Sequence, residues 1–160
     1  MTNNIIIFIH LMAAAIAIGS MVFSVILLLP SIEKVSTQQK SVEFSTTYKS
    51  VELLTPTVFT CLLILIGTGV YYLLENYTGQ MALKSGYYNL FGLKLICVVI
   101  AFFLSVYQTF NLRARIANLD LSPENRKIVP KTIQQIKKTT IPVLVTFSLA
   151  LFFGIWLARF

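Results

Sequence analysis

Acidic residues are scarce in this sequence: the 160-residue chain has six Asp and Glu residues in total, against 13 Lys and Arg. All six fall outside the long apolar runs or at their ends. Paired carboxylates for acid–base catalysis are therefore not indicated. A nucleophile paired with a base and a glycine-rich phosphate loop are missing from the sequence as well.

Cysteine and histidine are almost absent too. Cys61 and Cys97 fall in different apolar runs, so neither a disulfide framework nor a Cys-x-x-Cys zinc site is indicated, and both are interpreted as small packing residues. His10 is the single histidine and lies within "FIHLMAAAIAIGSM". A metal site built from several imidazoles of one chain is thereby excluded.

Apolar residues are abundant, at 56% of the chain with a mean hydropathy of +0.78. Four runs approach the roughly 20 apolar residues that a membrane-spanning helix needs, at about 5–29, 56–74, 90–110 and 141–158. The first run has no basic residue before it and is too long for a signal-peptide core, so it is expected to stay as the first span. The sequence predicts an all-α integral membrane four-helix bundle in one domain, 1–160.

The basic residues predict how the chain is oriented. Segments 31–55 and 111–140 carry three and seven of the 13 Lys and Arg residues. The bias of cytoplasmic loops toward these residues places both long basic loops in the cytoplasm and both termini outside, in a multi-pass protein of the cell inner membrane. The net charge of +7 is explained by anionic lipid next to these loops, without nucleic acid.

Local patterns refine this prediction. The basic loops are expected to extend the spans as helix, because apolar residues recur at near-helical spacing at Ile32, Val35, Val42 and Val51, and Ser122 followed by Pro123 is typical of a helix start. Pro56 and Pro142 are expected in the first turns of spans two and four, where a missing N–H is tolerated. Seven aromatic residues near the proposed outer boundary fit an interfacial belt: Tyr71, Tyr72, Tyr77, Tyr87, Tyr88, Trp156 and Phe160.

His10 and Lys94 are the two ionisable residues clearly inside the predicted spans, and such residues mark sites or buried partners. Each lies about five residues from the proposed outer end of its helix, so both occupy one layer. Small or polar residues share their helical faces, which predicts that these faces point inward. The expected inward stripes are Ala13, Ala14, Ala17, Met21 and Ser24 in span one, and Thr57, Thr60, Cys61, Ile64 and Thr68 in span two. In span three the stripe is Cys97, Ala101, Ser105 and Gln108, and in span four it is Phe147, Ala150, Gly154 and Ala158.

Other interpretations stay open for these groups. His10 is either a metal or haem ligand or a hydrogen-bonding residue between helices, and Lys94 either points inward or extends to the outer interface. Met12 points away from His10 and Met21 lies about 16 Å deeper by helical rise, so a joint His–Met copper site is not expected and both are interpreted as packing residues.

The sequence also contains a weak internal echo. His10 and Lys94 are 84 residues apart, Pro56 and Pro142 are 86 apart, and Gly69 and Gly154 are 85 apart. Two parallel helical hairpins related by an axis along the membrane normal would give this pattern.

Three stretches resemble a known family: "HLMAAAIAIGSMVF", "GTGVYYLLENY" and "LFGLKLICVVIAFFLSVYQTFNLRAR". Together they look like the CopD domain of copper-resistance proteins and, more distantly, the HemJ type of protoporphyrinogen oxidase. The likeness extends through about Arg115. The chain differs from the HemJ pattern in having Ile18 before Gly19 and Ser31 after Pro30, where that family usually has tryptophan and arginine.

The resemblance to CopD implies copper handling at the inner membrane beside a periplasmic copper carrier, with His10 as the metal ligand. The resemblance to HemJ implies an oxidoreductase that binds haem b through His10 and Lys94. With one histidine, a second axial ligand would come from Lys94, a methionine, water or another subunit, so a homo-oligomer is also considered. A third hypothesis is a non-catalytic subunit of a larger membrane complex. Copper or haem b bound at His10 and Lys94, in an outward-opening site, is the leading prediction.

Overall fold

In the computed structural model, the described residues are 2–31, 41–77, 86–112, 129–157 and 159. They form four long helices. α1 (Thr2–Phe23) continues into η1 (Ser24–Leu28), α3 spans Ser41–Tyr77, α4 (Tyr87–Tyr107) continues into η2 (Gln108–Leu112), and α6 spans Val129–Leu157. The predicted all-α, four-helix class is confirmed at this level.

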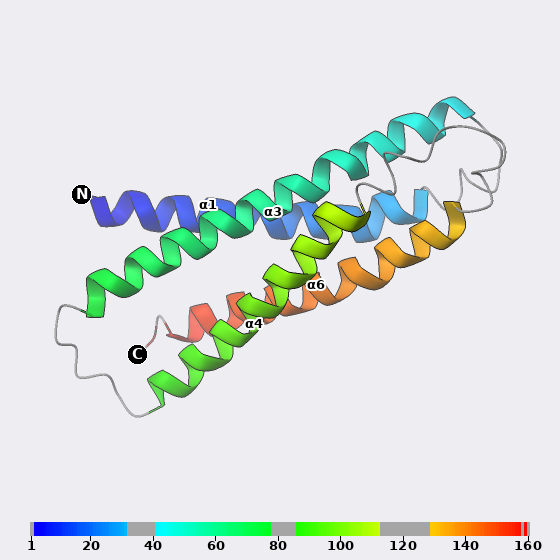
Figure 1. The fold of residues 1–160 in the computed structure, drawn as a ribbon. Coiled ribbons are helices and arrows are strands. Elements are labelled where there is room, and N and C mark those ends of the chain that lie inside the picture. The colour runs from blue at the N-terminus through cyan, green and yellow to red at the C-terminus, as the bar shows by residue number, and fades with distance from the viewer. Residues whose placement is uncertain (1, 32–40, 78–85, 113–128, 158, 160) are drawn as a thin grey trace.

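The helices pack as two hairpins. α1 lies against α3 and α4 against α6, while α1–α6 and α3–α4 contacts join the two pairs (Figure 1). The N-terminal end of α1, the C-terminal ends of α3 and α6 and the N-terminal end of α4 lie at one end of the bundle, here called the terminal end, and the opposite end is called the loop end. α1 and α4 therefore run in the same direction, as the internal echo in the sequence predicts.

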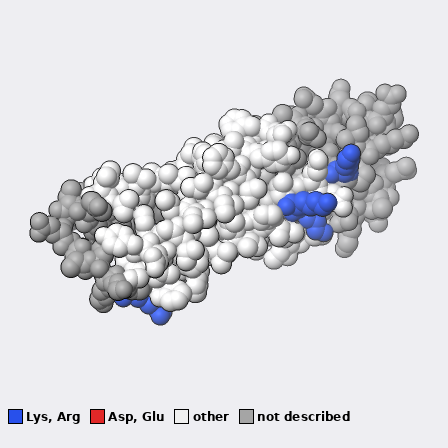
Figure 2. All heavy atoms as spheres, turned by 60° about the horizontal axis from the view of Figure 1, so that its bottom comes forward, with Lys and Arg blue, Asp and Glu red and all other residues white. Residues whose placement is uncertain are grey.

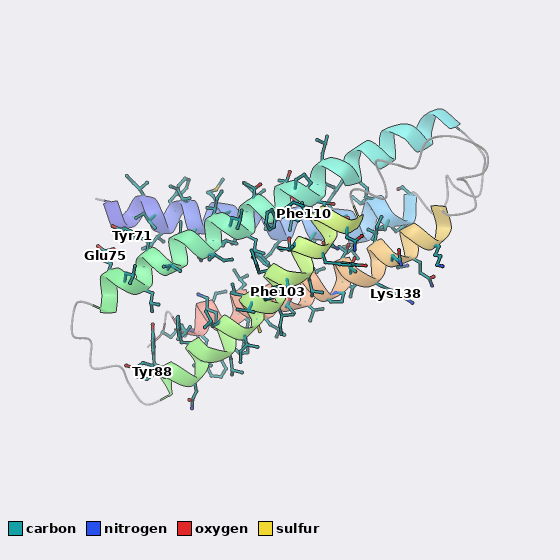
Figure 3. The ribbon with its side chains drawn as sticks, in the orientation of Figure 1. Tyr71, Glu75, Tyr88, Phe103, Phe110 and Lys138 are labelled. Atoms are coloured by element: carbon teal, nitrogen blue, oxygen red, sulfur yellow. The ribbon has the colours of Figure 1, made fainter. Side chains whose placement is uncertain are left out.

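All four helices are long and apolar enough to cross a membrane. The candidate spans are Asn4–Ser31, Leu53–Glu75, Tyr87–Asn111 and Gln134–Leu157. Figure 2 shows Lys and Arg gathered toward the two ends of the visible face, with a long uncharged surface between them. Figure 3 places Tyr71, Glu75 and Tyr88 at the terminal end and Lys138 toward the loop end. We therefore describe the chain as a multi-pass membrane protein.

The two prolines do not open helices, contrary to the prediction. Pro56 and Pro142 are interior residues of α3 and α6, because both helices begin more than a turn earlier, at Ser41 and Val129. The predicted helical extension of the basic loops is thus confirmed for the described residues, and it is the reason that the proline prediction is wrong.

The inward faces of α1 and α4 agree with the predicted stripes. Ala17 and Ala101 are 0% and 1% exposed. The other predicted residues in these two stripes are buried, except Cys97, which is half-buried. Small side chains therefore line the centre of the bundle, where they allow the helices to approach closely.

The predicted inward stripe of span two is confirmed for Cys61, which is buried, and for Thr68, which is half-buried, but it is wrong for the other three residues. Thr57, Thr60 and Ile64 are exposed, whereas Val58 and Leu62 are buried. The threonine hydroxyls donate to the carbonyls of Leu53 and Pro56, four residues earlier, at 2.8 and 2.9 Å. Because these hydroxyls are satisfied by their own helix, they face outward without an unpaired polar group.

The structure strengthens the internal echo into a matched pair of hairpins. π-helical turns begin at Ser24 and Gln108, which are 84 residues apart, like His10 and Lys94. Thr60 and Thr146, 86 residues apart, each donate to the carbonyl of the preceding proline. The two hairpins therefore repeat both their packing and their local irregularities.

Candidate functional site

His10 lies in α1 near the terminal end, where it contacts α3. Its Nδ1 is 2.6 Å from Oγ1 of Thr68, and its Cε1 faces Gly69, at which an added Cβ would lie 3.9 Å away. The imidazole is half-buried. One edge of the ring thus contacts α3, through the hydrogen bond to Thr68 and the close approach of Gly69.

The hydrogen bonds of Thr68 indicate which tautomer His10 adopts. Oγ1 of Thr68 donates its single hydrogen to the carbonyl of Ile64 at 2.7 Å or to that of Leu65 at 3.2 Å. When Oγ1 donates to either carbonyl it accepts from His10, and Nδ1 then carries the imidazole hydrogen. The lone pair of Nε2 is left to act as a ligand or base, the arrangement usual for histidines that bind metals.

Lys94 lies in α4 and packs toward α6 instead of extending to the interface. It is half-buried, and a Cβ added at Gly154 would lie 3.4 Å from its Nζ and 3.6 Å from its Cε. The glycine therefore allows the amine to rest against the α6 backbone. Within the part of the chain that the structure describes, no hydrogen bond or ion pair of the Lys94 ammonium is found.

His10 and Lys94 occupy corresponding places in the two hairpins, 84 residues apart in α1 and α4. Each is the polar residue near the start of the first helix of its hairpin, and each contacts a glycine of the second helix. The candidate site therefore consists of the Lys94 amine and the His10 imidazole, which lie at equivalent positions of the two hairpins.

The remaining candidates lie elsewhere. Met12 is 46% exposed, which agrees with the prediction that it points away from His10, while Met21 is buried. Cys61 is buried and Cys97 half-buried, and neither forms a disulfide. Among the described residues, no three His, Cys, Asp or Glu side chains lie together where they could hold a metal ion.

Sequence reasoning missed the groups that position the site. Thr68 was expected on the inward face but not as the partner of His10, and the contacts of Gly69 and Gly154 with the two ionisable groups were not foreseen. The one available signal was the spacing between Gly69 and Gly154, which nearly equals that between His10 and Lys94.

Comparisons with known proteins add no relative to this picture. No family model, no curated protein and no solved structure matches this chain. The function is therefore inferred from the residues and geometry of the chain itself.

Proposed function

We propose that the protein holds a haem b at the terminal end of the bundle, with His10 as an iron ligand and Lys94 as the second group that the cofactor contacts. The observation that carries this proposal is the His10–Thr68 hydrogen bond, which orients the ring and leaves Nε2 as the donor. Haem iron needs only one or two axial protein ligands, and His10 and Lys94 supply that number.

Lys94 suits either of two roles beside such a group. As a neutral amine it would hold the iron together with His10. As an ammonium without a described ion-pair partner it attracts the carboxylate groups of a porphyrin, because a half-buried cation is stabilised by an opposite charge. Bound haem would supply one-electron redox chemistry, and the chain itself would supply orientation and electrostatics.

Haem is favoured over copper by the number of donors. A copper ion on one imidazole takes its further ligands from outside the described cluster, whereas a porphyrin brings four nitrogen ligands with it. We also propose the orientation that the basic loops indicate, in the cell inner membrane, with the terminal end and the site outside and the loop end in the cytoplasm. We further propose that the chain is related to the CopD and HemJ group.

Absorption spectroscopy and metal analysis of the purified protein test this proposal. Haem b is added to the protein in detergent or nanodiscs, and a Soret band with stoichiometric iron is expected. His10→Ala is expected to abolish the ligand-dependent Soret shift, while Met12→Ala, which changes an exposed residue two positions away, keeps it. Thr68→Val is expected to weaken haem binding by about tenfold, as for a partner that orients a ligating histidine.

Two results would replace the proposal. Copper bound stoichiometrically and lost in His10→Ala, with no Soret shift on haem addition, would support copper handling. If neither ligand depends on His10, the imidazole acts as a hydrogen-bonding link between α1 and α3, the role that the Thr68 contact also supports. The chain would then be treated as a non-catalytic subunit of a membrane complex.

A further inference from the structure

A second polar cluster lies toward the loop end of the α4–α6 hairpin, apart from His10 and Lys94. The side-chain amide of Gln108 donates to Oγ1 of Thr139 at 3.1 Å and to Oγ1 of Thr140 at 2.9 Å. Both threonine hydroxyls donate in turn to carbonyls of α6. We call Gln108, Thr109, Thr139 and Thr140 the glutamine cluster.

Thr109 is the member of the glutamine cluster whose hydrogen-bonding capacity is unused. The residue is 8% exposed, and its Oγ1 has no hydrogen-bond partner within the described residues. Six other threonines of the described helices donate to a carbonyl four residues earlier: Thr57, Thr60, Thr68, Thr139, Thr140 and Thr146. Thr109 differs from them in lying in the π-helical turn η2, which is wound more widely than an α-helix.

An unpaired buried hydroxyl destabilises a protein, so its presence points to a bound group. The amide oxygen of Gln108, the preceding residue in the chain, is a further acceptor in the glutamine cluster. π-helical turns are also frequent at binding sites. The loop end of α4 thus presents a donor and acceptors inside the protein rather than toward lipid.

We propose that the glutamine cluster binds water and is the point at which water enters the bundle from the loop end. Every member of the cluster is neutral, and water is both donor and acceptor, as Thr109 and Gln108 require. A bound cation is disfavoured because the exposed Lys137 and Lys138 lie on the adjoining turn of α6.

The position of the cluster explains both how water arrives and where it stops. Thr109 is two residues from the end of the Tyr87–Asn111 span, so the path from the loop end is short. One turn further into the membrane, Ser105 is 1% exposed. Beyond Ser105, Ala101 and Ala17 belong to one buried cluster and are 1% and 0% exposed. This tightly packed alanine layer separates the water site from His10 and Lys94.

Water-edited solid-state NMR of the protein in lipid bilayers, with labelled Thr and Gln, tests the proposal. Magnetisation from water is expected to reach Thr109 and the side-chain amide of Gln108. Thr109→Val removes the hydroxyl at nearly constant shape and is expected to abolish the transfer to the Gln108 amide. Thr146→Val is the matched control, because the Thr146 hydroxyl is bonded to the Pro142 and Val143 carbonyls, and it is expected to leave that transfer intact.

Two results would overturn the water site. One is a wild-type spectrum in which neither Thr109 nor the Gln108 amide receives magnetisation from water. The other is a Thr109→Val spectrum with unchanged transfer to Gln108. Should Thr109→Val fail to fold, Thr109→Ser keeps the hydroxyl and is expected to retain the transfer, and the wild-type measurement alone still decides the question.

Discussion

The α1–α3 and α4–α6 hairpins share one framework but differ in their polar chemistry. Their most buried helix contacts are matched, with Ala17 and Ala101 at equivalent positions and a π-helical turn after each. Their polar links lie at opposite ends. Among the described residues, the bond from His10 to Thr68 lies at the terminal end of the first hairpin, and the bonds from Gln108 to Thr139 and Thr140 lie toward the loop end of the second.

This difference shows how the repeat separates packing from chemistry. Positions that determine the distance between helices are kept small in both hairpins, since any larger residue would push the helices apart. At equivalent positions, the hydrogen-bonding or ionisable side chains differ between the hairpins, as His10 and Lys94 do.

The largest effect is expected from overpacking the matched alanines. Ala17→Leu and Ala101→Leu should each lower the free energy of unfolding by about 3 kcal/mol, because no space is left at either position. Chemical or thermal unfolding in detergent measures this, with the exposed Ala15→Leu as the control. Similar losses for the two variants support equivalence, and a harmless Ala101→Leu would break it.

The next effect concerns the contact between hairpins. Phe59 of α3 packs against Phe102 and Phe110, with ring centroids 6.2 and 5.9 Å away. Phe59→Ala is expected to cost about 2 kcal/mol of unfolding free energy through lost ring contacts. Phe103→Ala, which removes a ring that is 66% exposed, serves as the control. Equal losses would mean that the hairpins do not depend on this aromatic contact.

The polar links should differ in strength. Gln108→Leu removes two interhelical hydrogen bonds and is expected to lower stability by about 1.2 kcal/mol, whereas Thr68→Val removes one and is expected to lower it by about 0.6 kcal/mol. Thr60→Val is the reference, because its bond lies within one helix. A Thr68→Val loss larger than that of Gln108→Leu would reverse the contrast.

The smallest effect is expected at glycines without neighbours. A Cβ added at Gly19 or Gly67 meets nothing within 4 Å, so Gly19→Ala and Gly67→Ala should change the unfolding free energy by at most about 0.5 kcal/mol. Gly154→Ala places a methyl group beside Nζ of Lys94 and should alter haem binding while leaving stability similar. Unfolding and haem titration of the three variants distinguish these outcomes, and a strongly destabilised Gly19→Ala would indicate a contact at that face.

The four helices and the inward faces of α1 and α4 could be predicted because lipid selects for long apolar runs, and the small residues that face inward are interspersed among Ile, Leu and Phe. The face of α3 could not, since the sequence does not reveal that Thr57 and Thr60 bond their own helix. The π-helical turns have no sequence signal of their own. Likewise, the pairing of His10 with Thr68 depends on how two distant helices align, which spacing within one helix does not determine.

The parallel repeat has a consequence for how the protein is made. Each hairpin begins and ends at the terminal end of the bundle, so each contains an even number of membrane crossings. Adding, removing or separating one hairpin therefore leaves the orientation of the other unchanged. During synthesis, α1 and α3 are able to pair in the bilayer before α4 leaves the ribosome. The α4–α6 hairpin then packs against an α1–α3 hairpin that has the same arrangement.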